Sequence, residues 1–304
     1  MEKTLPLSIN QTIYKHFFIA RKEDRDFLYY FRMAIGIFCL LHFASYLSDF
    51  ESIYVNNSIV PQDIMDIQRP WFVPNIASTL DYISSSLHLS KELLLHTFLG
   101  YYMLLCVCLA TGLFSRFTAI NLLILHLVIV KGSSVYSYGV DYFTSIALFY
   151  CVIFPVGHSK SLDRLLFNYE SVNPSPYRKI LQLHLCIVYF ASGVEKIIGD
   201  NWRNGESIWK SLHLPGFTSA VSMDYEFLST LPMLALIIGW SVVLIELLYP
   251  LFIWKQPYRN IGLLLVCSMH LGILLCLGLY YFSSLMIILN LTAFLDLSPN
   301  DNRK

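Results

Sequence analysis

The sequence predicts an all-α integral membrane protein, a polytopic bundle of about eight transmembrane helices. The chain of 304 residues is 56% hydrophobic and 14% charged, and its mean hydropathy is +0.55. An ordinary soluble chain is about 45–50% apolar and about 25% charged, so this chain has more apolar surface than one soluble core could bury. In addition, the apolar residues form runs of about 20, the length of a helix that crosses a bilayer.

Eight such runs follow one another along the chain. They are residues 27–47, 93–114, 118–135, 142–156, 180–198, 231–254, 260–279 and 281–297. The third and fourth are short, and the polar, Gly-containing segment 132–141 between them blurs the span boundaries between 115 and 156. No small-residue cleavage site follows the first run, so we expect no removable signal peptide. We expect one transmembrane domain, residues 1–304, with spans from about 27 to 297.

The lysines and arginines predict an orientation. Counted over alternating loops, most of them fall on the side that carries both termini, and the richer side of a membrane protein is cytoplasmic. Both termini are therefore predicted to be cytoplasmic. The two longest connections, 48–92 and 199–230, then face outward. They either cap the bundle or form the wall of a cavity, since long loops are often functional.

Composition also limits the partners. The formal net charge is zero, so no basic field attracts nucleic acid, and the expected environment is the lipid bilayer. The cysteines all lie in apolar runs, where a thiol is a small buried hydrophobe. We therefore expect neither disulfides nor a metal site.

Ionisable residues inside the predicted spans are the first functional candidates, because each is costly at bilayer depth. They are Arg32, His42, His126, His184, Glu246 and His270. A lone histidine is most often a packing residue whose nitrogens are hydrogen-bonded. Arg32 stays charged, so it needs a carboxylate, a cluster of carbonyls or water. Glu246 is the only acid well inside a span, and a structural Arg32–Glu246 pair would explain both.

The fifth span carries polar side chains on one face. At about 100° per residue, Tyr189, Ser192, Gly193 and Lys196 share a face and Glu195 lies on its flank. Gly193 lets another helix approach closely or leaves room for a ligand. Lys196 is either a neutral base in a pocket of low dielectric or an anchor whose ammonium extends to the interface.

A family resemblance begins at these residues. The motif, from Tyr189 past Trp202, is YFASGVEKIIGDNWRNGESIWKSL, and it resembles the lysine-bearing motif of the vitamin K-dependent gamma-carboxylase and its bacterial HTTM relatives. Further segments resemble the same family in the same order, from about 28 to 297. They are RMAIGIFCLLH, SIVPQ, LATGLFSRFTA, YFTSIALFYCVIFPVGHSKSLDRLL and MHLGILLCLGLYYFSSLMIILNLTAFL.

The resemblance implies roles for individual residues. Lys196 matches the carboxylase lysine that deprotonates vitamin K hydroquinone, and Glu195 stands where that family has a second lysine, so it could pair with Lys196. With His270 of the late segment, these are the candidate catalytic residues. The candidate substrate or cofactor pocket comprises Tyr189, Ser192, Gly193, Trp202, Arg32 and Glu246. Before SYG the chain has serines where the carboxylase has Asn-His, and we expect it to do without the carboxylase's large extramembrane domain.

The small bacterial branch, which includes the sporulation-delaying protein B group, fits the length best. That likeness implies a bacterial cytoplasmic membrane as the location. It also implies modification or maturation of a secreted peptide or toxin, with a precursor peptide and an accessory protein as partners. Two alternatives remain open. One is a carboxylase or oxidase that uses a quinone or vitamin K hydroquinone, and the other is a non-catalytic chaperone, immunity or transport partner.

Overall fold

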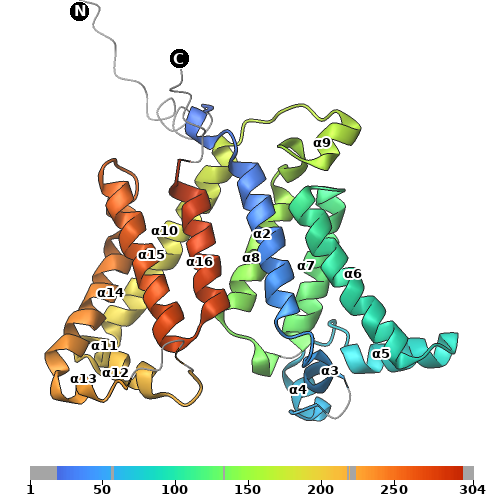
Figure 1. Ribbon diagram of the computed structural model, residues 1–304, viewed down its shortest axis with the longest axis horizontal. Helices are drawn as coiled ribbons and strands as arrows, with labels where there is room; N and C mark the ends of the chain where they lie inside the picture. Colours follow the sequence, from blue (N-terminus) through green and yellow to red (C-terminus); the bar gives the residue numbers. More distant parts are fainter. Residues whose placement is uncertain (1–18, 56–57, 133, 218, 220–223, 297–304) are drawn as a thin grey trace, which may run out of the picture. The chain divides into compact units, whose positions relative to one another are not determined.

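The regular structure of the chain is helical. The structure, a computed structural model, describes residues 19–55, 58–132, 134–217, 219 and 224–296 (Figure 1). Across these ranges the elements are α-helices and short 3-10 helices, without a strand. The predicted all-α class is therefore confirmed.

A helix lies at each of the eight predicted apolar runs. These helices are α2 (Phe27–Ala44), α6 (Lys91–Thr111), α7 (Ser115–Gly132), α8 (Gly139–Ile153), α10 (Ser175–Ile198), α14 (Pro232–Phe252), α15 (Tyr258–Leu277) and α16 (Tyr280–Phe294). All but α8 and α16 are long and apolar enough to cross a membrane, which makes six. With 15 residues each, α8 and α16 are about 22 Å long, against a hydrocarbon core of about 30 Å. The number of about eight spans stays a prediction.

The two long connections contain helices of their own. The first holds α3 (Phe50–Tyr54), α4 (Gln62–Gln68) and α5 (Ile76–Leu87), and the second holds α11 (Asp200–Arg203), α12 (Glu206–His213) and α13 (Phe227–Thr230). A further short helix, α9 (Leu162–Phe167), follows α8. The described parts of these segments are therefore built largely of short helices.

The contacts divide the chain into two compact units. Unit 1 comprises Met1–Phe27 and Asn173–Lys304, and unit 2 comprises Leu28–Val172. In unit 1, α14 packs against α10 and α15, and α16 packs against α10 and α15. In unit 2, α7 packs between α6 and α8, and α9 lies at the opposite end of the helices from α3, α4 and α5 (Figure 1). The prediction of a single domain stays a prediction.

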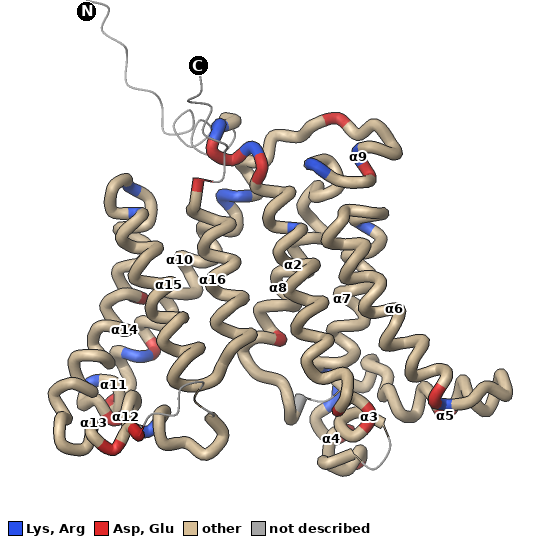
Figure 2. The backbone as a smooth tube through the Cα atoms, in the orientation of Figure 1, with Lys and Arg blue, Asp and Glu red and all other residues tan. Residues whose placement is uncertain are grey.

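Apolar side chains cover the outside of the long helices. Leu104, Ile187 and Leu264 are 56%, 66% and 68% exposed, whereas Arg32 and Glu246 are 1% and 6% exposed. Figure 2 shows charged residues mainly at the ends of the long helices and in the connections. This distribution suits helices that face lipid, as expected of an integral membrane protein.

Candidate functional site

The predicted face of α10 points at α14 in unit 1. Tyr189 and Gly193 are buried, Ser192 and Lys196 are half-buried, and Glu195 on the flank is exposed. The polar positions predicted to share a face therefore do so. Their alignment follows from the helical repeat alone.

Lys196 turns into the protein. Its Nζ donates hydrogen bonds to Glu246 Oε2 at 2.7 Å and to Ser192 Oγ at 2.6 Å, and it lies 5.2 Å from the centre of the Trp202 ring. The two charged side chains are only 19% and 8% exposed. An anchor would place its ammonium in water, so this geometry is that of an internal ion pair. The carboxylate that pairs with Lys196 is Glu246, in place of the expected Glu195.

Gly193 brings the two helices of the pair together. A Cβ at this position would lie 2.8 Å from the backbone nitrogen of Leu247 and 2.8 Å from its Cγ. Of the two explanations for Gly193, the close approach of a helix is therefore the one observed, and the Leu247 side chain occupies the space that a ligand would need. The same approach brings Glu246, the neighbour of Leu247, within reach of Lys196.

A second buried network lies in unit 1 beside the ion pair. The Tyr249 hydroxyl donates to Asn290 Oδ1 at 2.7 Å, and Asn290 Nδ2 donates to the Tyr189 hydroxyl at 2.7 Å and to Met286 O at 2.8 Å. The Tyr189 hydroxyl also lies 2.8 Å from His270 Nε2. The Tyr189 phenol has one proton to donate. The largest number of polar atoms is hydrogen-bonded when Tyr189 donates this proton to His270 Nε2.

With this hydrogen-bond assignment, one buried N–H donor has no acceptor among the described residues. Neutral His270 then carries its proton on Nδ1, and Nδ1 is buried without a hydrogen-bond partner among the described residues. Lys196 is close enough to act electrostatically on His270, and Glu246 on Tyr189. Lys196 and Ser192 thus share α10 with Tyr189, which contacts His270, and Glu246 shares α14 with Tyr249, whose ring centre lies 4.4 Å from that of Tyr189.

Asn290 and Tyr249 are members of this network that sequence reasoning missed. The available signal was Asn290 itself, since a primary amide inside an apolar run is costly unless it is hydrogen-bonded. Its exposed fraction is 0%. By contrast, His126 fits the packing role expected of a lone histidine. Its nitrogens contact the Tyr102 hydroxyl at 3.2 Å and Asp141 O at 3.1 Å.

Arg32 belongs to unit 2 and has other partners than the expected Glu246. Its Nη1 donates to Val156 O at 2.9 Å and its Nη2 to Lys160 O at 2.8 Å. Of the possibilities considered, the carbonyl cluster is therefore the one observed, and the predicted Arg32–Glu246 pair is corrected. Gly112, at φ 76°, leaves room for the guanidinium, because a Cβ there would lie 2.5 Å from Arg32 Cζ.

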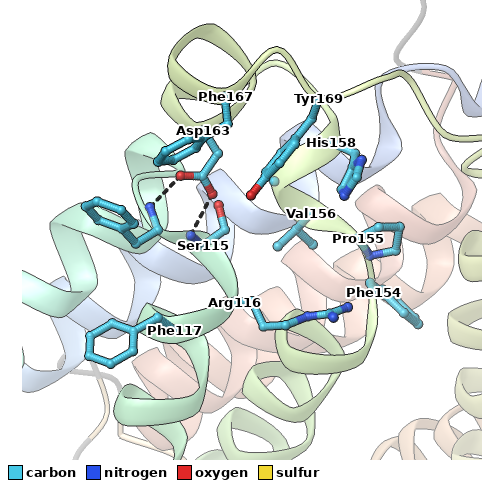
Figure 3. Close-up of a pocket in the computed structure, with 12 residues that line it drawn as sticks. Ser115, Arg116, Phe117, Phe154, Pro155, Val156, His158, Asp163, Phe167 and Tyr169 are labelled. Carbon is cyan, nitrogen blue, oxygen red and sulfur yellow. Dashed lines mark hydrogen bonds between the residues drawn. The ribbon is translucent and has the colours of Figure 1, made fainter.

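A cavity of about 280 Å³ lies in unit 2, between the start of α7 and the segment that follows α8 (Figure 3). Asp163 Oδ1 accepts from Phe114 N at 2.5 Å, and Oδ2 accepts from Ser115 N at 2.7 Å. The carboxylate thus binds free backbone donors at the start of α7, a structural role. The rings of His158 and Tyr169 stack 4.6 Å apart beside it. None of the predicted site residues lines this cavity.

The candidate site in unit 1 has four side chains that can exchange protons: Lys196, Glu246, Tyr189 and His270. The small cavity in unit 2 contains the carboxylate of Asp163, which caps the start of α7. An amine, a carboxylate, a phenol and an imidazole are the groups that enzymes use for acid–base steps. Comparisons with protein-family models, with curated proteins and with solved structures gave no match.

Proposed function

We propose that this chain is a membrane-embedded enzyme of the HTTM type that modifies or matures a secreted peptide, with Lys196 as its base. The observation that carries the proposal is the internal ion pair of Lys196 with Glu246, whose side chains are 19% and 8% exposed. The motif around Lys196 and its resemblance to the gamma-carboxylase motif support the same assignment.

The pair provides a route to a neutral amine. When the proton in the hydrogen bond between Lys196 Nζ and Glu246 Oε2, atoms 2.7 Å apart, passes to the carboxylate, two neutral groups result, which a low dielectric favours over two charges. The free amine can then accept a proton from a substrate, becoming an ammonium while the substrate becomes an anion. Ser192 and Trp202 hold Nζ in place, and the unpaired Nδ1–H of His270 can donate to the developing negative charge.

A quinone or vitamin K hydroquinone does not fit the space at Gly193. Leu247 lies there at 2.8 Å from a would-be Cβ, so an aromatic ring could enter only if α10 and α14 separated. Peptide modification is therefore proposed without a step through a quinone. The accessory protein and the precursor peptide remain the proposed partners.

The decisive variant is Lys196→Arg. Arginine can keep the ion pair with Glu246 but does not deprotonate in a protein. Cells that carry the wild-type chain, a deletion, Lys196→Arg or Lys210→Arg are compared by mass spectrometry of their secreted peptides. Lys210 is the control, since it is an exposed lysine paired with Glu206 on α12 of the same unit.

We expect the peptide that disappears in the deletion to disappear also with Lys196→Arg, while Lys210→Arg still produces it. Protein levels in the membrane fraction show whether each variant is made. If Lys196→Arg accumulates normally and yields the full amount of mature peptide, the base assignment is wrong and a chaperone or transport role takes its place.

A further inference from the structure

A second, larger cavity in unit 2 has a strongly cationic lining. Its volume is about 860 Å³, and α2, the end of α6 and residues 160–168 line it. Three of the lining residues are the cations Arg32, Lys160 and Arg164, and among its described lining residues none is acidic. A cavity lined by three cations, with no carboxylate among the lining residues that the structure describes, attracts an anion.

The carboxylate of Asp163 does not neutralise the buried cation Arg32 by direct contact. Asp163 lies between two lining residues in the sequence, but its oxygens bind the backbone at the start of α7. Arg32 is held by the carbonyls of Val156 and Lys160, which leave its full positive charge in place. Its Nε–H is buried and has no hydrogen-bond partner among the described residues. An acceptor is therefore missing beside a guanidinium that lines the cavity.

Lys160 and Arg164 form the accessible edge of the cavity. Both residues are exposed. The Tyr29 ring joins this edge to the buried cation, because its centre lies 5.7 Å from Lys160 Nζ and 5.9 Å from Arg32 Cζ. An anion at this edge can contact the two exposed cations and lie in the field of the third.

The rest of the lining is apolar and runs along a helix. Met33 and Ile37 of α2 belong to it, as do Leu162 and Leu165 of α9. From Arg32 to Ile37 the helix rises about 7.5 Å, so the apolar wall continues past the buried cation. Ile37 is 44% exposed and Leu165 is 76% exposed, which suits contact with hydrocarbon better than contact with water.

We propose that this cavity binds an anionic phospholipid, with the headgroup phosphate at Lys160 and Arg164 and one acyl chain along Met33 and Ile37. The cationic edge selects an anion, and the apolar wall selects an amphiphile over a free phosphate ion. The volume lies within the roughly 300–1,000 Å³ of common ligand sites. Residues 160–164 also belong to the side of the membrane predicted to be cytoplasmic, whose leaflet is anionic.

The test uses the purified full-length protein in detergent and native mass spectrometry. Phosphatidylglycerol and phosphatidylcholine with identical acyl chains are titrated separately, and inorganic phosphate is added as a competitor in a third series. Lys160→Gln and Arg164→Gln each remove one exposed cation from the edge. Arg116→Gln is the matched control, because Arg116 is an exposed cation of unit 2 that does not line this cavity.

We expect tight retention of one phosphatidylglycerol and weak retention of phosphatidylcholine. Each edge variant should lower the phosphatidylglycerol affinity about fivefold, the contribution of one cation near an anionic headgroup, and Arg116→Gln should leave it unchanged. Ile37→Trp, which fills the apolar wall without altering charge, should weaken binding more than Ile124→Trp, a change at an exposed residue of α7 outside the cavity.

Three results would overturn the proposal. Equal retention of the two lipids would show that the cations do not select the headgroup. If Arg116→Gln lowered the phosphatidylglycerol affinity as much as Arg164→Gln does, the binding would depend on overall surface charge and not on this cavity. Displacement of phosphatidylglycerol by inorganic phosphate, with no effect of Ile37→Trp, would assign the site to a free phosphate ion.

Discussion

Lys196 in unit 1 and Arg32 in unit 2 are both cations of long apolar helices, but they have different partners. Lys196 forms an ion pair with a carboxylate and is neutralised by it. Arg32 is held by two backbone carbonyls, which are dipoles without net charge. The first arrangement is neutral overall and holds a proton that can move. The second remains positive, so it suits the binding of an anion and offers no proton for exchange.

The largest expected effect comes from separating the partners of the ion pair. Glu246→Leu leaves Lys196 without a counterion, and Lys196→Met leaves Glu246 without one, each at about 3–5 kcal/mol of unfolding free energy. The double variant should cost less than the sum of the two, because it leaves no unpaired charge. The measurement is equilibrium unfolding in detergent micelles.

Arg32→Leu provides the contrast in the same experiment. Combined with Glu246→Leu, it should be additive to within about 0.5 kcal/mol, as for residues that share no partner. Strong coupling between Arg32 and Glu246, or additivity between Lys196 and Glu246, would reverse the assignment of partners.

A smaller effect is expected from disturbing the position of Arg32. Gly112→Ala introduces a Cβ at φ 76° and 2.5 Å from Arg32 Cζ, and it should destabilise unit 2 by more than about 1 kcal/mol. Gly100→Ala is the control within α6, the helix that Gly112 ends, since a Cβ at Gly100 has no neighbour within 4 Å. It should be neutral or stabilising by about 0.5–1 kcal/mol. Equal effects of the two variants in thermal unfolding would show that the guanidinium does not need this space.

The smallest effect belongs to an exposed ion pair outside the long helices. On α4, Asp66 Oδ1 accepts from Arg69 Nε at 2.8 Å and from Asn75 Nδ2 at 2.9 Å. The hydrogen bond from Arg69, followed by that from Asn75, lowers the pKa of Asp66 below its ordinary value. The stabilisation is therefore fully present above the unfolded pKa, about 3.9, and is lost as the pH falls through the lower folded pKa.

Because Asp66 is largely in water, its contribution should stay below about 1 kcal/mol. Hydrogen exchange of the backbone around residues 66–75 should show protection that decreases as the pH falls from about 4 through the lower folded pKa of Asp66, after correction for intrinsic rates. Asp66→Asn should remove most of that pH dependence. A pH dependence that survives in Asp66→Asn would assign it to another group.

The sequence predicted where the long helices lie and which residues share a helix face, but it did not predict which residues of different helices contact each other. The eight apolar runs coincide with eight helices, and the shared face of Tyr189, Ser192 and Lys196 follows from the helical repeat. The partner of Lys196 lies 50 residues away, and a hydrophobic pattern does not specify which helices pack together. Glu246 was therefore recognised as a buried acid and assigned to the wrong cation.

The carbonyl cluster around Arg32 was considered but could not be located from the sequence. It depends on the path of the backbone between Val156 and Lys160, and on the positive φ of Gly112. Loop paths of this kind are set by tertiary contacts, which no periodicity encodes. For the same reason the cationic cavity of unit 2 had no signal in the sequence.

The separation of Lys196 and Glu246 along the chain also has a consequence for biosynthesis. The ribosome makes α10 first, and the counterion of Lys196 follows 50 residues later, about 3–10 s at common rates of translation. During this interval α10 carries an uncompensated ammonium near one end of its apolar stretch. We therefore expect stable insertion of α10 to depend on α14, because the ammonium of Lys196 gains its counterion only when both helices are present.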